Sequence, residues 1–376
     1  MNILFLVGSM GAGGAERVAS VLCNSWSDQG HAVTLMPTFS GKGDCLYQIS
    51  KEVEFVYLAD LVGCGAFPYI SKMIRLRALR KFIIGNAPDV VVSFQVHVNI
   101  ASILSSLGNS IPLIVCERSY PGTADVPWVM RVLRRFFYSR AHAIVCQTKA
   151  AKTWLVKRFP KSEIVIISNP ISFPLPLGHS ALLKPGDFVS ADRSVLLAVG
   201  RLGPEKGYDL LIEAFSILAS ENKDWDLVIV GEGKNREKLN LMVHDNGLKN
   251  RIFLPGEVGN PGDWYDRADL FALTSRYEGF PNALLEAMSY GVAPVSFDCL
   301  AGPSDVIEHK VNGYLVSPEE GVRGLCKGLK CLMSDSSLRN EFGKKAKLST
   351  QSNYSLDKVN EDWMKIIRGT LPLAAN

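Results

Sequence analysis

The sequence predicts an α/β protein made of two doubly wound, Rossmann-like domains. Its 376 residues exceed the roughly 250–300 at which a single hydrophobic core stops growing, so two domains are expected. Short apolar runs of strand length alternate with helical patterns along most of the chain, which is the order that produces parallel sheets. Residues 169–193 are rich in Pro and Gly without firm periodicity, and this linker divides the pattern into two series.

The first series opens with an apolar run, a glycine-rich loop and a helix, which together begin a βαβ unit. The loop Gly8–Arg17 leads into a helix that ends near Gln29. Its glycines leave room for a phosphate, although a turn without a ligand is the alternative. A dinucleotide site is not expected, because Glu16 stands where the fingerprint requires a small residue. Residues 1–168 form the first domain, with strands expected at Asn2–Val7, His31–Pro37, Val53–Leu58, Val90–Phe94, Pro112–Cys116, Ala143–Gln147 and Ile164–Ile167.

The second series predicts a domain of residues 194–352, followed by a C-terminal segment, 353–376. Glycine-containing turns follow four of its strands, and ligands in open parallel sheets bind beyond the carboxyl ends of strands. The tail Ser355–Ile367 has the spacing of an amphipathic helix, which must pack on another surface. Strands are expected at Ser194–Val199, Asp226–Val230, Ile252–Leu254, Leu270–Leu273 and Ala293–Phe297.

Composition argues against several classes of protein. The N-terminus lacks the pattern of a signal peptide, and no run approaches the ~18 apolar residues of a membrane-spanning helix. The eight cysteines contain no C-x-x-C pair, so no metal site is expected. Basic residues outnumber acidic ones in residues 1–176 but not in the remainder, which predicts an anionic partner for the front half. Nucleic acid is not the expected partner, because no recognition helix or aromatic stacking platform is evident.

The segment Ser275–Gly291 is the strongest candidate site. A turn at Glu278 and Gly279 follows an apolar strand, and a helix is expected from Asn282 to about Tyr290. Pro281 suits the start of a helix, where a missing N–H costs nothing. A strand, a glycine turn and a helix N-terminus together present N–H groups and a positive dipole end to an anion.

Charged side chains near this turn suit a phosphorylated ligand. Glu278 and Glu286 would flank the anion and suit hydroxyl groups, unless they are ordinary exposed acids. Arg201 and Lys206 flank another turn at the end of a strand and suit a diphosphate, unless they are simply exposed. The triplet Asp224-Trp225-Asp226 stands before the strand residues Leu227–Val230, at the wrong end of the sheet for a site, and is interpreted as a turn.

Two groups of residues in the first domain are candidates for contacts with other partners. His97, Glu117 and Arg118 follow predicted strands and are candidates to face a second ligand, although a solitary His is more often structural. The expected helix Val129–Tyr138 carries cations on one arc and apolar residues on the opposite side. It is predicted to lie on an anionic membrane surface through Arg131, Arg134 and Arg135, unless these form only a solvated basic face.

Taken together, these residues resemble the retaining, GT-B-fold glycosyltransferases of family 4. The pair Glu278 and Glu286 matches the family's E-x7-E motif, and three further segments match in the right order: Gly13–Arg17, Gly200–Gly207 and Val311–Val316. The resemblance spans nearly the whole chain. It implies two domains that face each other across a cleft, with a C-terminal helix that returns to the first domain.

The resemblance also implies roles for individual residues. Arg201 and Lys206 would bind the donor diphosphate, and Glu286 the ribose hydroxyls of the nucleotide. Glu278 would orient the transferred sugar as the candidate catalytic residue, and Gly14 would approach the diphosphate from the first domain. His97, Glu117 and Arg118 would lie on the acceptor side. The start of the helix would contact the donor through Gly279, Phe280, Pro281, Asn282, Ala283 and Leu284.

Two segments, Arg276–Asn282 and Asp298–Pro303, look most like bacterial enzymes that extend undecaprenyl-diphosphate-linked oligosaccharides, typically from UDP-sugars such as UDP-N-acetylgalactosamine. The chain departs from them at Ser304-Asp305, where Arg-Glu is common. The expected function is metal-independent hexosyl transfer, with retention and without a cofactor, from a UDP-HexNAc or UDP-hexose to a lipid-linked glycan acceptor in lipopolysaccharide or exopolysaccharide synthesis. The expected location is cytoplasmic, peripheral at the inner face of the plasma membrane. A GT-B-related sugar-nucleotide epimerase and a non-catalytic nucleotide-sugar-binding protein are the alternatives.

Overall fold

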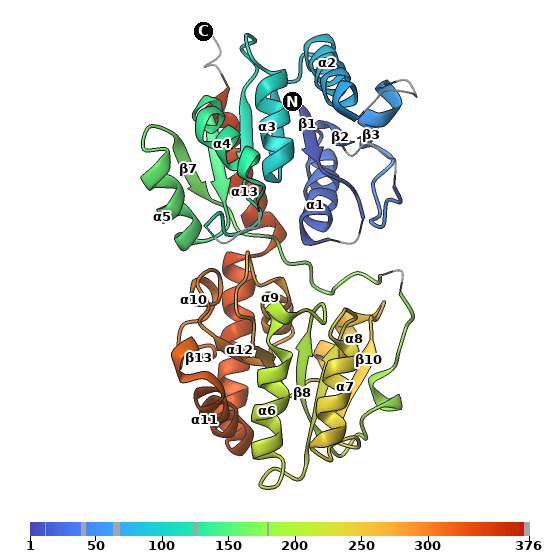
Figure 1. Cartoon of the computed structure of the whole chain (residues 1–376), viewed down its shortest axis with the longest axis vertical. Helices are drawn as coiled ribbons and strands as arrows, with labels where there is room; N and C mark the ends of the chain where they lie inside the picture. Colours follow the sequence, from blue (N-terminus) through green and yellow to red (C-terminus); the bar gives the residue numbers. More distant parts are fainter. Residues whose placement is uncertain (12, 39–42, 63–67, 123–125, 179, 372–376) are drawn as a thin grey trace. The chain divides into compact units, whose positions relative to one another are not determined.

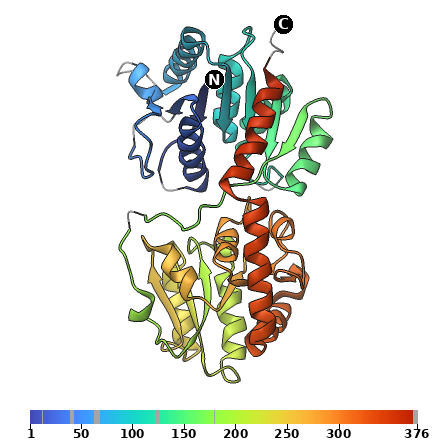
Figure 2. The same cartoon turned by 180° about the vertical axis from the view of Figure 1, so that it is seen from behind.

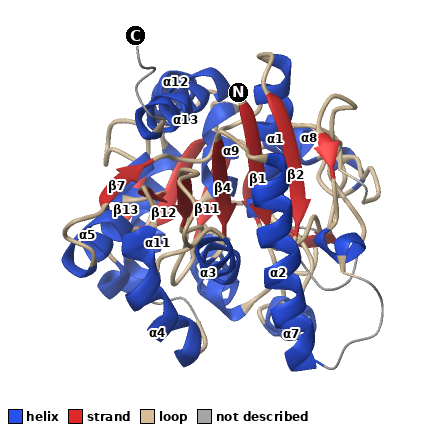
Figure 3. Ribbon diagram, turned by 90° about the horizontal axis from the view of Figure 1, so that it is seen from above, coloured by secondary structure: helices blue, strands red, loops and turns tan. Residues whose placement is uncertain are grey.

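The computed structural model describes residues 1–11, 13–38, 43–62, 68–122, 126–178 and 180–371. The chain divides into two compact units, each built around one parallel sheet (Figure 1). Unit 1 contains Met1–Asn169 and Asp357–Asn376, and unit 2 contains Pro170–Leu356. In Figure 3 the helices, in blue, surround the strands, in red.

Unit 1 has a seven-stranded sheet in the order β3-β2-β1-β4-β5-β6-β7. Its central strands are buried runs of aliphatic residues, as expected for a parallel sheet covered on both faces. The strand order reverses between β1 and β4, which creates a topological switch point where ligands of such sheets bind. The strands are β1 (Asn2–Val7), β2 (Ala32–Pro37), β3 (Glu54–Phe55), β4 (Val90–Phe94), β5 (Leu113–Cys116), β6 (Ala143–Cys146) and β7 (Glu163–Ile166).

The helices of unit 1 connect these strands or pack beside them. They are α1 (Gly14–Asp28), α2 (Pro68–Asn86), α3 (Val96–Ser105), α4 (Trp128–Phe137), α5 (Lys149–Arg158) and α13 (Leu356–Thr370), with short 3₁₀ helices η1 (Leu58–Leu61) and η2 (Tyr138–Arg140). The expected strand Val53–Leu58 is shorter than predicted. It lies at the sheet edge and pairs only at Glu54 and Phe55, so its far end is free to enter η1.

Unit 2 has a six-stranded parallel sheet in the order β10-β9-β8-β11-β12-β13, with its switch point between β8 and β11. Its strands are β8 (Ser194–Val199), β9 (Trp225–Val230), β10 (Ile252–Gly256), β11 (Leu270–Leu273), β12 (Ala293–Phe297) and β13 (Tyr314–Val316). Its helices are α6 (Tyr208–Leu218), α7 (Arg236–Asp245), α8 (Pro261–Arg267), α9 (Asn282–Ser289), α10 (Pro303–Val306), α11 (Gly321–Ser334) and α12 (Ser336–Asn353), with η3 (Pro185–Asp187), η4 (Pro204–Lys206) and η5 (Pro318–Glu320).

The C-terminal helix α13 belongs to unit 1 although the preceding helix, α12, belongs to unit 2 (Figure 2). Trp363 on α13 is 1% exposed, and its ring lies 5.9 Å from that of Trp26 on α1. The Trp26 Nε1–H donates to Asn360 Oδ1 at 3.1 Å, so the buried indole nitrogen has a partner. These contacts give the amphipathic tail the surface that its apolar spacing requires.

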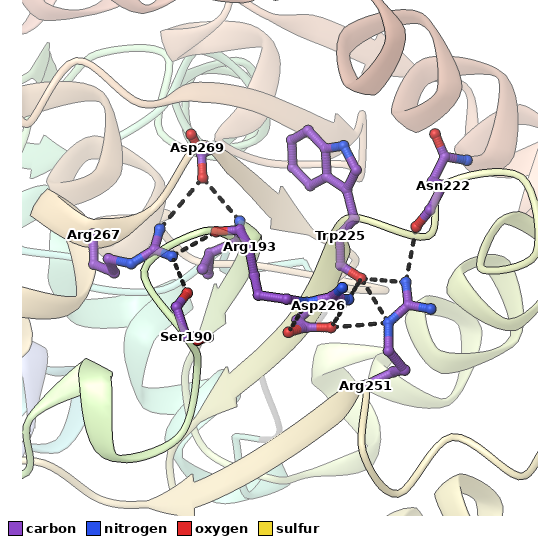
Figure 4. Close-up of polar contacts among 9 residues, drawn as sticks. Ser190, Arg193, Asn222, Trp225, Asp226, Arg251, Arg267 and Asp269 are labelled. Atoms are coloured by element: carbon purple, nitrogen blue, oxygen red, sulfur yellow. Dashed lines mark hydrogen bonds and ion pairs between the residues drawn. The ribbon is translucent and has the colours of Figure 1, made fainter.

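The linker residues pack along unit 2 and end in a cluster of ion pairs (Figure 4). Arg193 donates to both carboxylate oxygens of Asp226, at 2.8 and 2.5 Å, and Arg251 reaches the same carboxylate at 2.9 Å. Asp226 is 3% exposed and stands at the start of β9. The second Asp of the D-x-D triplet is therefore a structural anchor that holds the linker and β10 to the sheet.

No helix among the described residues is both long and apolar enough to cross a membrane.

Candidate active site

Two loops meet at the switch point of the unit 2 sheet, one after β8 and the other after β11. The Thr274 Oγ1–H donates to the carbonyl of Lys206 at 2.9 Å, and the N–H of Arg276 donates to the carbonyl of Glu205 at 2.8 Å. Gly207 allows this approach because its φ is +64° and a Cβ there would lie 2.1 Å from the Thr274 carbonyl oxygen. The sequence segments that carried Lys206 and Glu278 thus form one surface.

Lys206 and Glu278 make an ion pair at the centre of this surface. The Lys206 Nζ lies 2.6 Å from Glu278 Oε1, and the side chains are 20% and 9% exposed. Ser275 Oγ–H donates to the same Oε1 at 2.6 Å. The carboxylate is therefore held in one orientation, while the ammonium keeps two N–H donors for other acceptors.

Arg201 is far more exposed than Lys206. Its side chain is 77% exposed, and its Nε lies 3.3 Å from Glu205 Oε1. An ion pair this exposed contributes little to stability. Arg201 is thus available to a ligand at the edge of the site, whereas Lys206 is already positioned.

The start of α9 presents unpaired backbone donors beside the ion pair. Within the described residues, the N–H groups of Gly279, Phe280 and Ala283 make no hydrogen bond. Pro281 stands at the N-cap and has no N–H to satisfy. Gly302, in the loop after β12, packs on Pro281, where a Cβ would lie 2.5 Å from Pro281 Cδ. Free N–H groups at a helix N-terminus bind anions, and the nearby Lys206 adds positive charge.

Glu286 lies one turn into α9 and is 6% exposed. Its Oε2 accepts a hydrogen bond of 2.8 Å from the hydroxyl of Tyr265 on α8. The carboxylate is fixed by this contact, which suits the recognition of a vicinal diol. Asn282 and Leu284 extend the same helix, the first partly exposed and the second buried.

Three residues of the site had no role assigned from the sequence: Ser275, Tyr265 and Thr274. Ser275 precedes Glu278 by three residues, a spacing at which two side chains in a turn can reach each other. Their contact could therefore have been predicted from the sequence. Tyr265 lies 21 residues from Glu286 and is brought to it only by the packing of α8 on α9. Thr274 contacts the other loop, so only the fold shows its role.

In unit 1, the glycine loop and the residue after β4 meet at the other switch point. Glu16 is 8% exposed and accepts a 3.1 Å hydrogen bond from Gln95 Nε2. A Cβ on Gly8 would lie 3.1 Å from the Nε2 of His97, which follows at the start of α3. Gly14 is the exposed first residue of α1. Burial and the nearby charge of Arg75 lower the pKa of His97.

Glu117 and Arg134 form a buried ion pair instead of serving the two partners that the sequence suggested. Their side chains are 1% and 4% exposed, and Arg134 Nη1 lies 3.3 Å from Glu117 Oε1. The guanidinium of Arg134 also stacks 4.7 Å above the ring of Trp154. Burial raises the pKa of Glu117 despite this partner. The prediction that Arg134 faces a membrane is wrong, and Glu117 is enclosed rather than presented to a ligand.

Arg118 follows β5 and packs on Phe94 at the end of β4. Its guanidinium lies 4.2 Å above the ring of Phe94 and donates to Asn169 Oδ1. Burial lowers the pKa of Arg118. Its Nε has no hydrogen-bond partner among the described residues, which leaves one donor for a ligand.

The helix α4 exposes most of the apolar residues expected opposite its cations, and Trp128 besides. Trp128, Val129, Val132 and Phe136 are 69%, 42%, 43% and 63% exposed. Arg131 and Arg135 are exposed as well, whereas Leu133 is partly buried. Cations and apolar side chains of α4 therefore both reach the surface, because the fold buries Arg134 and leaves most of the apolar side chains of this helix exposed.

Comparison with known proteins identifies the family. The model "Glycosyltransferase Family 4" matches residues 12–173, and "Glycosyl transferases group 1" matches residues 185–349. The chain is 28% identical to an undecaprenol-linked glycan N-acetyl-D-galactosaminyltransferase of Campylobacter jejuni, with 98% of each chain covered. It is 25% identical to the amylovoran biosynthesis glycosyltransferase AmsD of Erwinia amylovora, over 97% of this chain and 99% of the relative.

A solved structure shows the same fold. HepE of Anabaena, in complex with UDP, superposes with a TM-score of 0.77 at 18% identity, covering 98% of this chain and 100% of that chain. The two parallel-sheet units are thus the Rossmann-like domains of the GT-B fold. Because the two family models match the two units in turn, this chain belongs to the GT-B glycosyltransferases of family 4.

Proposed function

We propose that this protein moves a hexose or N-acetylhexosamine from a UDP-sugar to a lipid-linked glycan acceptor, with retention of anomeric configuration and without a metal ion. The observation that carries the proposal is the surface at the unit 2 switch point, where Lys206, paired with Glu278 at 2.6 Å, lies beside unpaired N–H groups of α9. The undecaprenol-linked acceptor in the name of the Campylobacter relative supports the acceptor class. The UDP bound by HepE supports the nucleotide.

Each residue of this surface has a proposed part in binding the donor. Lys206 and the N–H groups of Gly279 and Ala283 hold the diphosphate, and the exposed Arg201 folds onto it. Glu286, fixed by Tyr265, accepts hydrogen bonds from the ribose hydroxyls. The remaining proposed donor contacts are Phe280, Pro281 and Asn282. Leu284 is not one of them, because its side chain is fully buried and its N–H donates to the carbonyl of Pro281 at 3.1 Å.

The reaction proposed for this site breaks the bond between the anomeric carbon and the diphosphate oxygen. Negative charge develops on the leaving diphosphate, and Lys206 with the helix N-terminus stabilises it. The acceptor hydroxyl attacks from the face that the diphosphate leaves, and its proton passes to the departing phosphate oxygen. Glu278 orients the sugar, because Ser275 and Lys206 fix its carboxylate. No cofactor enters this scheme.

The proposed location is the cytoplasmic face of the plasma membrane, with α4 as the attachment. Its exposed Trp128 and Phe136 suit the interfacial region of a bilayer, and Arg131 and Arg135 suit anionic headgroups. This arrangement replaces the original prediction, in which Arg134 was a membrane contact. Flotation with phosphatidylglycerol vesicles tests it. Wild-type protein floats, and Trp128→Ser with Phe136→Ser does not; equal flotation of both would contradict the attachment.

A panel of nucleotide-sugars, read by donor hydrolysis and by transfer, tests the activity. Turnover of a UDP-sugar that rises on addition of a lipid-linked glycan supports the proposal. Conversion of the UDP-sugar into its epimer without an acceptor would instead favour the epimerase alternative. Binding of nucleotides without turnover of any donor would favour a non-catalytic binding protein.

A further inference from the structure

Unit 1 contains an apolar pocket between α2, α3 and α4 that the donor chemistry does not use. Its volume is about 290 Å³, just below the roughly 300–1,000 Å³ of ligand pockets. Three helices supply its wall, with Leu76 and Leu79 from α2, Ala101 and Leu104 from α3, and Met130 and Leu133 from α4. A pocket of this size and lining fits a short stretch of hydrocarbon chain.

The same pocket has a positive edge formed by Lys72 and Arg75, which lie three residues apart on one face of α2. Lys72, Arg75 and His97 line it together with the apolar residues. Burial lowers the pKa of Arg75, and the charge of Arg75 in turn helps to lower the pKa of His97. The pocket therefore combines an apolar wall with a positive edge, which is the complement of an amphiphile with an anionic head.

Arg75 has an unused hydrogen-bond donor at this edge. One Nη2–H donates to the carbonyl of Thr38, while the buried Nε has no hydrogen-bond partner among the described residues. A partly desolvated guanidinium gains from an anionic neighbour, and Arg binds phosphate oxygens strongly. The geometry thus favours a phosphate next to the hydrocarbon rather than a neutral lipid.

The helix α4 connects this pocket with the exposed apolar stripe. Met130 and Leu133 turn into the pocket, while Val129 and Val132, their neighbours in sequence, are exposed. A hydrocarbon chain that leaves a bilayer along the exposed face of α4 would have to cross only one helix to reach the pocket. That distance is about 10–12 Å, the diameter of an α-helix with its side chains.

We propose that this pocket binds the phosphate-proximal isoprenoid segment of a prenyl-phosphate lipid, with Lys72 and Arg75 on the phosphate and the apolar wall on the first isoprene units. The inference rests on the proposed function for the class of acceptor, and it identifies which residues hold the lipid rather than the sugar. It also gives His97, a predicted acceptor-side residue, a place on the rim of this pocket.

The test measures binding of farnesyl diphosphate, farnesol and inorganic pyrophosphate to the full chain by isothermal titration calorimetry. Wild-type protein is expected to bind farnesyl diphosphate at least tenfold more tightly than either fragment. Ala101→Phe fills the pocket and is expected to weaken that binding at least tenfold. Leu104→Phe provides a second filled pocket if the first variant has a lower melting temperature.

A matched pair of charge reversals on α2 tests the positive edge. Lys72→Glu is expected to weaken binding of farnesyl diphosphate at least fivefold, while Arg77→Glu, an exposed cation on the same helix that does not line the pocket, changes it less than twofold. Equal losses in the two variants would overturn the inference, as would undiminished binding in both filled-pocket variants. Equal affinity for farnesol and farnesyl diphosphate would also overturn it.

Two further readouts distinguish this inference from binding of a bilayer headgroup and from the proposed donor chemistry. Phosphatidylglycerol vesicles that displace farnesyl diphosphate from the wild type, but not from Trp128→Ser, would assign the pocket to a bilayer headgroup and overturn the prenyl assignment. UDP binding, measured on the same preparations, reports on unit 2 and is expected to be unchanged in every variant. Failure of donor turnover with intact farnesyl diphosphate binding would refute the proposed function and leave the pocket assignment standing.

Discussion

Replacement of Lys206 by alanine is the sharpest perturbation of the proposed donor site. Lys206 Nζ contacts Glu278 Oε1 at 2.6 Å and is 20% exposed, so the mutation removes a positioned charge rather than a mobile one. It leaves Glu278 with the hydrogen bond from Ser275 but without its cation. The carboxylate then repels the diphosphate that Lys206 would have attracted.

The expected magnitude follows from the position of this charge. A full charge on a phosphate oxygen about 4 Å from the ammonium interacts with it by about 4 kcal/mol at an effective dielectric constant of about 20. Only part of that charge develops during bond cleavage, and Glu278 already balances part of the ammonium. If about one third of the interaction is specific to the transition state, the loss is about 1.4 kcal/mol, which is tenfold in rate.

The assay is the initial rate of transfer from the donor that the panel selects, with kcat and KM determined separately. Lys206→Ala is expected to lower kcat at least tenfold, and Lys206→Arg to restore part of it. Lys330→Ala is the matched control, because Lys330 also pairs with a glutamate at 2.6 Å, but on the exposed surface. The double variant with Glu278→Ala is expected to lose less than the sum of the two single losses, because the residues are in contact.

Near-wild-type kcat in Lys206→Ala would refute this reasoning. So would a loss of equal size in Lys330→Ala, which would point to a general effect of removing charge. Strict additivity of Lys206→Ala and Glu278→Ala would contradict the inference that Lys206 positions the carboxylate.

Three other perturbations follow from contacts elsewhere in the molecule. Tyr265→Phe removes the 2.8 Å hydrogen bond that orients the carboxylate of Glu286. The loss of about 1 kcal/mol of donor-binding energy is expected to raise the KM for the donor about fivefold. An unchanged KM would contradict the role of Glu286. Asp226→Ala leaves the guanidiniums of Arg193 and Arg251 without their carboxylate. It is expected to lower the free energy of unfolding in urea by about 2–3 kcal/mol, which is less than for a fully buried pair because both guanidiniums remain partly exposed. A loss below about 0.5 kcal/mol would show that the cluster in Figure 4 is not an anchor. The pKa of His97 is lowered in the folded protein, so the unfolded chain binds a proton first as the pH falls below the ordinary value of 6.5. The free energy of unfolding therefore decreases below that pH. His97→Gln is expected to show a smaller decrease in urea unfolding, and a decrease identical to that of the wild type would contradict this reasoning.

The strands were predictable because buried parallel strands are continuous aliphatic runs that need no partner to be recognised. Asn2–Val7 and Val90–Phe94 are the observed bounds of β1 and β4, as predicted. The edge strand β3 was overestimated because its length depends on pairing with β2, which the sequence does not reveal. β13 was noticed only as part of the motif Val311–Val316, since a three-residue strand is too short for a pattern.

The candidate site was predictable where loops and helix ends follow strands, since the switch point brings such segments together. Lys206 and Glu278 were identified separately, and the fold places them in contact. The burial of Arg134 was not predictable. Its place on the basic arc of α4 was predicted from the sequence, but its buried partner, the carboxylate of Glu117, belongs to the segment after β5. A charge pattern on one helix does not show which charges have partners across the core.

The most direct test of the account is a crystal structure of the full chain with UDP. The diphosphate is expected within hydrogen-bond distance of Lys206 Nζ and the N–H groups at the start of α9, with the ribose hydroxyls on the carboxylate of Glu286. UDP bound away from Lys206 and Glu286 would contradict it.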